Sequence, residues 1–285
     1  MIPIRVIRRR IRSIKNTAKI TKAMEMIAAS KMRQAQLRVL AARPYAEKMR
    51  DVMADLAAQP QAEEETHPLL QHREVKRIGV IHITADRGLC GGLNANMNRR
   101  TVSFILEQRV PVNLITVGRR GRDFMSRYGQ EIRAEFTQLG DKPSVIDTTP
   151  ISRVVIDDYT NKLIDQVYLA YTQFITTVTQ RPVLQKLLPI EPAKIERAEN
   201  VDYIYEPSAY IVLRELLPRY VEMQVYHAIL ESIASEQSAR MVAMRNATDN
   251  AIEMIENLTL IYNKARQELI TKELLDIAGG VATLT

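Results

Sequence analysis

The sequence contains few of the residues on which metal, redox and membrane chemistry depend. One cysteine, Cys90, excludes a disulfide within the chain, and four scattered histidines without a cysteine partner do not have the spacing of a ligand cluster. No stretch approaches the roughly 18 uninterrupted apolar residues of a membrane span. The opening residues also lack the apolar segment of a secretory signal. We therefore expect no metal, no cofactor and no membrane helix, and a chain that stays in the cytosol.

Glycine and proline are missing from two long stretches. Residues 2–59 contain no glycine and, apart from Pro3 near the start, only Pro44, while residues 220–278 contain neither glycine nor proline. Because glycine and proline interrupt or end helices, the pattern predicts one long helix at each end of the chain. The second stretch would be roughly 85 Å long as a single helix. No compact domain encloses a helix of that length.

The middle of the chain alternates between strand and helix patterns. Strands are predicted over residues 77–84 and 112–117, helices over 94–108 and 153–166, and β-rich runs over 167–179 and 183–190. This order is typical of a Rossmann-like α/β domain. The predicted division is an N-terminal coiled-coil helix over residues 1–59, a linker over 60–75, an α/β domain over 76–206 and a C-terminal coiled-coil helix over 207–285.

Both terminal helices carry a seven-residue apolar repeat. Its N-terminal seam is broken only at Thr21 and Glu25, and its C-terminal seam only at Gln237 and Arg240. The first seam comprises Ile4, Ile7, Ile11, Ile14, Ala18, Thr21, Glu25, Ala28, Met32, Ala35, Val39, Ala42, Ala46, Met49, Met53 and Leu56. The second comprises Tyr226, Leu230, Ile233, Gln237, Arg240, Met244, Ala247, Ala251, Met254, Leu258, Ile261 and Ala265. A repeat held this long predicts a left-handed coiled coil, here between the two ends of one chain.

One antiparallel register aligns the breaks in both seams. It places Glu25 opposite Arg240, a polar pair that would fix the register at some cost in stability. In this register the N-terminal helix ends opposite Ile261, and the C-terminal helix continues alone. That segment is rich in leucine and isoleucine, including Leu269 and Leu274. An apolar helix end of this kind predicts an interaction site.

The N-terminal helix is strongly basic. Eleven lysines and arginines stand against a single acid, Glu25, in the first forty residues. Such a face can be solvated, can bind nucleic acid or can lie inside an acidic protein ring. The isoleucine seam favours the protein ring, because it commits one face to a helix partner. A nucleic-acid-binding or stand-alone coiled-coil scaffold remains the alternative. The cations concerned are Arg8, Arg9, Arg10, Arg12, Lys15 and Lys22.

A glycine-rich turn raises the possibility of nucleotide binding. The letters GLCGG, residues 88–92, follow a predicted strand and precede a predicted helix, as phosphate-binding turns do. The spacing does not match GxGxxG, however, and no glycine in the chain is followed by lysine. Arg119 and Arg120 could contact a 2′-phosphate, which leaves a nucleotide-dependent enzyme as a weaker third hypothesis. We favour a tight turn with a buried Cys90.

Four segments carry a family resemblance that covers essentially the whole chain. They are MEMIAASKMRQAQ (24–36), TADRGLCGGLNANM (84–97), SEQSARMVAMRNATDNA (235–251) and IYNKARQELITKEL (261–274). Together they resemble the gamma subunit of F-type ATP synthases. The resemblance implies a non-catalytic rotor shaft inside a ring of three alpha and three beta subunits. It also implies an α/β foot on the epsilon subunit and the c ring, at the cytoplasmic face of a bacterial membrane.

The resemblance also implies contact residues. Met24 and Arg240 match positions facing the alpha and beta subunits. Further contacts with this ring are implied at Arg266, Gln267 and Thr271, and contacts with the c ring and epsilon at Tyr203, Tyr205 and Glu206. The two-cysteine regulatory insertion of chloroplast relatives is missing. Whether protons or sodium ions drive the rotation is left open.

Overall fold

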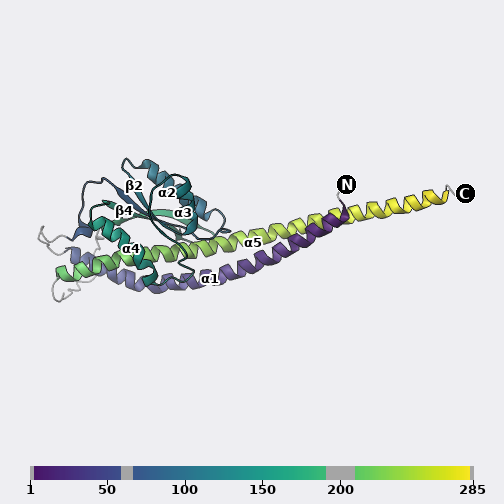
Figure 1. Ribbon diagram of the computed structural model, residues 1–285. Helices are drawn as coiled ribbons and strands as arrows, with labels where there is room; N and C mark the ends of the chain where they lie inside the picture. Colours follow the sequence, from purple (N-terminus) through teal and green to yellow (C-terminus); the bar gives the residue numbers. More distant parts are fainter. Residues whose placement is uncertain (1–2, 59–66, 191–208, 283–285) are drawn as a thin grey trace. The chain divides into compact units, whose positions relative to one another are not determined.

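The computed structural model describes residues 3–58, 67–190 and 209–282, and the chain forms two compact units. One unit combines residues 1–28 with residues 240–285, and the other comprises residues 29–239. Two long helices, α1 (Ile4–Ala58) and α5 (Ala209–Ala282), contribute to both (Figure 1). Pro44 lies within α1 and Pro218 within α5. No helix in these described ranges is long and apolar enough to cross a membrane.

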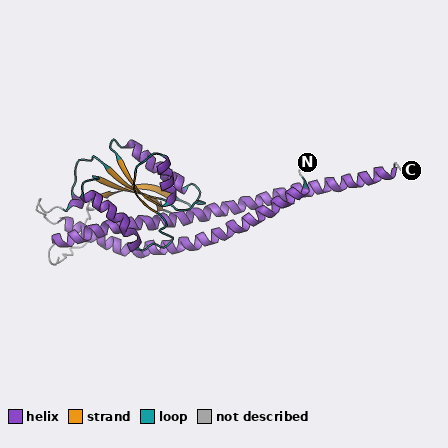
Figure 2. Ribbon diagram, viewed as in Figure 1, coloured by secondary structure: helices purple, strands orange, loops and turns teal. Residues whose placement is uncertain are grey.

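The unit of residues 29–239 is built on a five-stranded sheet (Figure 2). Its strands are β1 (Ile78–Ile83), β2 (Val112–Val117), β3 (Ile132–Phe136), β4 (Gln166–Phe174) and β5 (Gln180–Leu188), in the spatial order β3-β2-β1-β4-β5. The first four strands run parallel, and β5 is antiparallel to β4. The connecting helices are α2 (Leu93–Glu107), α3 (Arg119–Arg127) and α4 (Val145–Thr160). This is a doubly wound sheet, and the predicted α/β plus coiled-coil fold class is confirmed.

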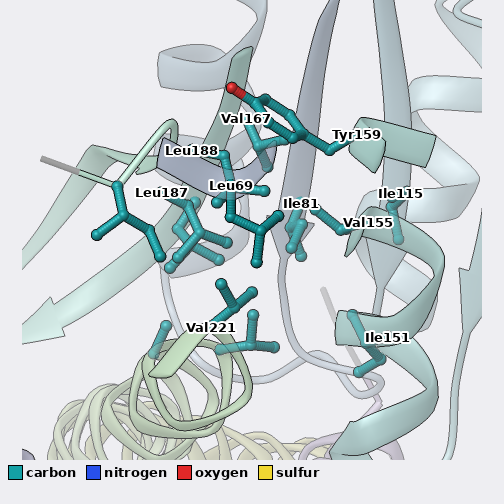
Figure 3. Packing of buried hydrophobic residues seen from close by; sticks show 14 of the residues in the cluster. Leu69, Ile81, Ile115, Ile151, Val155, Tyr159, Val167, Leu187, Leu188 and Val221 are labelled. Carbon is teal, nitrogen blue, oxygen red and sulfur yellow. The ribbon is translucent and has the colours of Figure 1, made fainter. Parts of the chain in front are cut away.

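Each face of the sheet packs on its own set of helices. Residues Ile78 and Val80 of β1 point toward Met97 of α2 and Met125 of α3. The other face, with Ile81, packs on α4, α5 and the short helix η2 (Pro68–Leu70), as Figure 3 shows around Val155, Leu69 and Val221. All six residues of β1 are buried. Coverage on both faces explains why IGVIHI reads as a continuous buried run rather than as an alternation.

Some elements differ from the sequence prediction. Helix α4 begins at Val145, eight residues before the predicted start at Arg153, with a capping box between Ser144 and Asp147. Pro150 is the sixth residue of this helix, past its first turn, and its missing N–H leaves one helical hydrogen bond unmade. Strand β3 and helix α3 were not predicted. Leu69 lies in the segment predicted as a linker, yet it is fully buried in the core.

Candidate partner-binding surfaces

The unit of residues 1–28 and 240–285 contains a paired segment of α1 and α5, called here the helical pair. On α1 between residues 3 and 28, the side chains that are not exposed are those of the predicted seam, with Met24 as the single addition. Ile7, Thr21, Glu25 and Ala28 are the most deeply buried of them. The seven-residue repeat therefore predicted the buried face of α1 correctly in this unit.

The facing seam on α5 is only partly as predicted. Met244, Ala251 and Ala265 are buried as expected. Between them, however, Thr248, Ile255 and Tyr262 are buried or half-buried although the prediction left them out, while the predicted positions Ala247 and Leu258 are half-buried. Met254 and Ile261 are 52% and 51% exposed. The alternation of four- and three-residue steps is thus reversed after Met244, and the predicted seam positions Met254 and Ile261 were wrong.

Polar contacts define the register of the helical pair. The hydroxyl groups of Thr21 and Thr248 lie 2.7 Å apart and share a buried hydrogen bond. Nearer the chain start, Arg8 Nη2 donates to the Tyr262 hydroxyl at 2.8 Å. This hydrogen bond lowers the pKa of Tyr262. Together these contacts show that the helices run antiparallel.

Glu25 adds a charged group to the contact between Thr21 and Thr248, and we call these residues and their partners the polar layer of the helical pair. The residue is 6% exposed, and its carboxylate accepts hydrogen bonds from Lys22 Nζ at 3.0 Å and from Arg245 Nε at 3.1 Å. The two cations, Lys22 first, hold the pKa of Glu25 below its ordinary value. The predicted opposition of Glu25 and Arg240 is therefore wrong by about one helical turn. A buried carboxylate needs a cation within reach, and Arg245 is the one that the register brings to it.

The C-terminal end of α5 extends past the start of α1 (Figure 1). Ala265 is still buried, whereas every residue from 266 to 275 is exposed. We call residues 266–282 the tip. Its exposed apolar side chains are Leu269, Ile270, Leu274 and Leu275, at 45%, 47%, 62% and 67%. An unpaired apolar segment of this kind marks an interaction surface.

The implied contact residues fall into three groups. Arg266, Gln267 and Thr271 are all exposed on the tip, where the Thr271 hydroxyl donates to the Gln267 carbonyl at 2.9 Å. Met24 is half-buried at the edge of the seam, and Arg240 is buried. The third group, Tyr203, Tyr205 and Glu206, lies outside the described residues.

Three exposed apolar side chains lie on α1 outside the predicted seam. Ile20, Met26 and Ile27 are 61%, 60% and 55% exposed, and none of them belongs to the seam. They lie on the same stretch of α1 as Met24. Apolar residues off the heptad positions of so basic a helix were the signal that could have identified this surface.

The crevice at the carboxyl ends of the parallel strands is where doubly wound sheets usually bind ligands. Here part of it is lined by the chain's own α5, through Ile229, Ser232 and Glu236, and by the loop after β3. Ser232 Oγ accepts from the Thr172 amide at 3.3 Å, and Ser235 Oγ donates to the Thr172 carbonyl at 3.0 Å. Helix α5 is thus bound to the strand end at the position a ligand would approach.

The glycine-rich turn is engaged in internal contacts. Cys90 is buried, and Asn94 Nδ2 donates to its sulfur at 3.2 Å. Asn94 Oδ1 accepts from the Ala85 amide at 3.1 Å, which ties the turn to the end of β1. The Arg119 amide donates to Asp86 at 2.9 Å. These contacts favour the tight-turn interpretation of GLCGG over phosphate binding.

His82 is a core residue of the sheet. Its Nε2 donates to Asn98 Oδ1 at 2.9 Å, and its Nδ1 accepts from the Thr101 hydroxyl at 3.0 Å. Full burial lowers its pKa to about 4. The ring is thus neutral and occupied on both sides. Across the described residues, no group of three or more His, Cys, Asp or Glu side chains could hold a metal ion.

Comparison with known proteins gives consistent matches over the whole length. The family model described as ATP synthase matches residues 3–284. An ATP synthase gamma chain of Dehalococcoides mccartyi is 64% identical over 284 residues, covering 100% of both chains. A chain in the central stalk and c-ring structure of the Tetrahymena thermophila mitochondrial ATP synthase matches with a TM-score of 0.62 and 26% identity, covering 80% of this chain and 99% of that one. A chain in the rotor of the Euglena gracilis mitochondrial ATP synthase matches with a TM-score of 0.66 and 21% identity, covering 94% and 98%.

Proposed function

Because this chain belongs to the ATP synthase gamma chain family, we propose that it turns as the central shaft of that machine. As a gamma chain it is a non-catalytic subunit, and ATP is made or hydrolysed elsewhere in the complex. The observation that carries the proposal is the helical pair, which ends in an unpaired apolar tip. A long helix with such an end calls for a surrounding protein.

A shaft of this kind works by making the nucleotide affinity of each catalytic site depend on the orientation of the shaft. In a ring of three alpha and three beta subunits, each catalytic site would meet a different side of the helical pair. Free energy passes between rotation and ATP chemistry only if each orientation favours a different set of site conformations. The unequal sides of the pair supply that difference. The exposed surface of α1 carries the cations Arg9, Arg10 and Lys15, and exposed apolar residues follow at Ile20 and Ile27.

The proposed contacts follow the surfaces described above. Arg266, Gln267 and Thr271 of the tip would meet the beta subunits, where the exposed leucines would leave water. Met24 and Arg240 would lie at the level where alpha and beta subunits press on the shaft. Arg240 is buried, so we expect it to act by holding the pair in shape as much as by direct contact.

The α/β unit is the proposed foot. The relatives with known structure come from assemblies described as a central stalk with a c ring and as a rotor. We propose that this chain likewise rests on a c ring and an epsilon subunit, with Tyr203, Tyr205 and Glu206 in that contact. Through the c ring it would be held peripherally at the cytoplasmic face of the membrane. Protons or sodium ions crossing the membrane would turn the ring and the shaft together.

Co-purification tests this proposal against the nucleic-acid alternative. A tagged chain expressed in its own cells should bring down alpha, beta and epsilon subunits together with ATPase activity. A nucleic-acid-binding protein would instead retain DNA or RNA and lose it steeply as salt is raised. Recovery of nucleic acid without any ATPase subunit would overturn the proposal.

A further inference from the structure

The loop between β3 and α4 reaches both long helices at one residue, Asp141. Its Oδ2 accepts from Lys31 Nζ of α1 at 2.7 Å, and its Oδ1 accepts from Gln237 Nε2 of α5 at 3.0 Å. Its backbone carbonyl accepts from Arg38 Nη1 of α1 at 3.4 Å. All four residues belong to the unit of residues 29–239. One loop residue of the α/β domain thus contacts α1 twice and α5 once.

Gln237 explains why this contact is specific. It breaks the apolar seam in the sequence, and its side chain is only 2% exposed. A buried amide without a partner is costly, and Asp141 supplies the acceptor. The seam therefore has the polar Gln237 in place of an apolar residue at the point where the loop contacts α5. Tyr226, also on α5, donates to the Pro143 carbonyl of the same loop at 3.5 Å.

The two helices are otherwise held by the α/β domain in different ways. Helix α5 is packed into the core through Leu217, Val221 and Val225 and is bonded to β4 through Ser232 and Ser235. Buried contact of α1 with that core comes from Met49, eighteen residues further along the chain than Lys31. Asp141 thus anchors α1 well away from the core contact.

We infer that Asp141 is a positioning residue that passes the turning force of the α/β domain to α1 and α5 together. This inference rests on the proposed function. Without this contact, α1 would be held to the domain at Met49 and to α5 through the seam, and its segment around Lys31 could shift along α5. With both helices fixed to one carboxylate, the pair turns as one body.

Variants that exchange the charges of Lys31 and Asp141 distinguish a role in passing force from a role in folding alone. Asp141→Ala removes both side-chain acceptors, and Lys31→Glu and Asp141→Lys each place like charges together. The double variant Lys31→Glu/Asp141→Lys restores an opposite pair, and Gln237 can present its amide oxygen to the new ammonium. Lys31 and Asp141 are partly exposed and their ion pair contributes little to stability, so the charge reversals should fold. Asp141→Ala also leaves the buried Gln237 amide without its acceptor, so the melting temperature of this variant is compared with that of wild type. Asp123→Asn is the matched control, because Asp123 pairs with Arg122 within α3.

The experiment uses the whole ATP synthase complex in vesicles, with each gamma-chain variant in place of the wild-type chain. ATP hydrolysis and ATP-driven ion pumping are measured in the same vesicles. The wild-type chain should restore pumping, and failure at this step would count against the proposed function itself. We expect Asp141→Ala and each single charge reversal to lower the ions pumped per ATP by roughly two- to fivefold. The double variant should regain most of the loss, and Asp123→Asn should match wild type.

Hydrogen exchange on the purified chain gives a second readout. Backbone amides around Lys31 should exchange faster in Asp141→Ala and return toward wild-type rates in the double variant. The inference is overturned if Asp141→Ala pumps as wild type does, if Asp123→Asn loses as much, or if the double variant recovers neither pumping nor protection.

Discussion

Single side chains decide how the α/β unit responds to pH. His82 is fully buried between Asn98 and Thr101, and burial lowers its pKa from 6.5 to about 4. Between these two values the unfolded chain binds a proton that the folded chain does not. The free energy of unfolding should therefore fall as the pH falls from 6.5 toward 4.

The change expected from His82 is on the order of 3 kcal/mol across that range. Replacement His82→Asn keeps a polar group but removes the titration, so its stability should vary less over the same interval. Urea unfolding at a series of pH values measures the difference. Parallel pH profiles for the two proteins would show that His82 does not carry the effect.

The polar layer shows how far single residues can be interpreted from sequence. Thr21 and Glu25 stand out as breaks in an isoleucine seam, so a polar pairing there was predictable. Their partners, Thr248 and Arg245, were not, because neither lay on the predicted α5 seam. Met254 and Ile255 are adjacent in the sequence and both apolar, and the same is true of Ile261 and Tyr262. Either residue of each pair could therefore continue the seven-residue repeat. Hydrogen-bond partners selected the register, and composition cannot show them.

Disulfide trapping tests the register of the two helices. With Cys90 replaced by serine, the pair Thr21→Cys/Thr248→Cys should form a cross-link on mild oxidation, because the two hydroxyls lie 2.7 Å apart. The pair Glu25→Cys/Arg240→Cys should remain mostly reduced. Mobility on a non-reducing gel distinguishes them. Cross-linking of the second pair in preference to the first would restore the register predicted from the sequence.

The tip is the element that depends most on a partner. Deletion from Arg266 onward should leave the melting temperature of the isolated chain little changed, since residues 266–275 are exposed. In the assembled complex the same deletion should weaken assembly or reduce ATP-driven ion pumping, because the apolar contacts with the ring would be lost. Replacing Leu269 and Leu274 by serine is the milder variant. Unchanged pumping by the truncated chain would contradict the role given to the tip.

Long elements were easier to predict than short ones. The absence of glycine and proline indicated α1 to within two residues of its observed ends, and α5 less closely, because α5 begins at Ala209 and runs through Pro218. Strand β3 reads IRAEF, in which charges alternate with small and apolar residues, and only partial burial results. Helix α3 opens with RRGR, which resembles a solvated loop. Both elements lie toward the β3 edge of the sheet, where the hydrophobic signal is weak.

The molecule combines an α/β domain with a helical pair, and as a gamma chain it is a non-catalytic subunit. The residue patterns predicted this combination, the segments that resemble a known family predicted its role, and the full-length match at 64% identity places the chain in that family. What the residues alone predicted was narrower. They gave a coiled coil with an apolar end and a basic face, which fits a shaft but does not identify the ring around it.

Rotation itself tests the central claim most directly. A probe fixed to the α/β domain of this chain, in complexes whose alpha and beta subunits are held on a surface, should turn in one direction when ATP is added. It should pause at thirds of a turn, because three catalytic sites act in sequence on one asymmetric shaft. A probe that stays still while the same complexes hydrolyse ATP at the full rate would contradict the account.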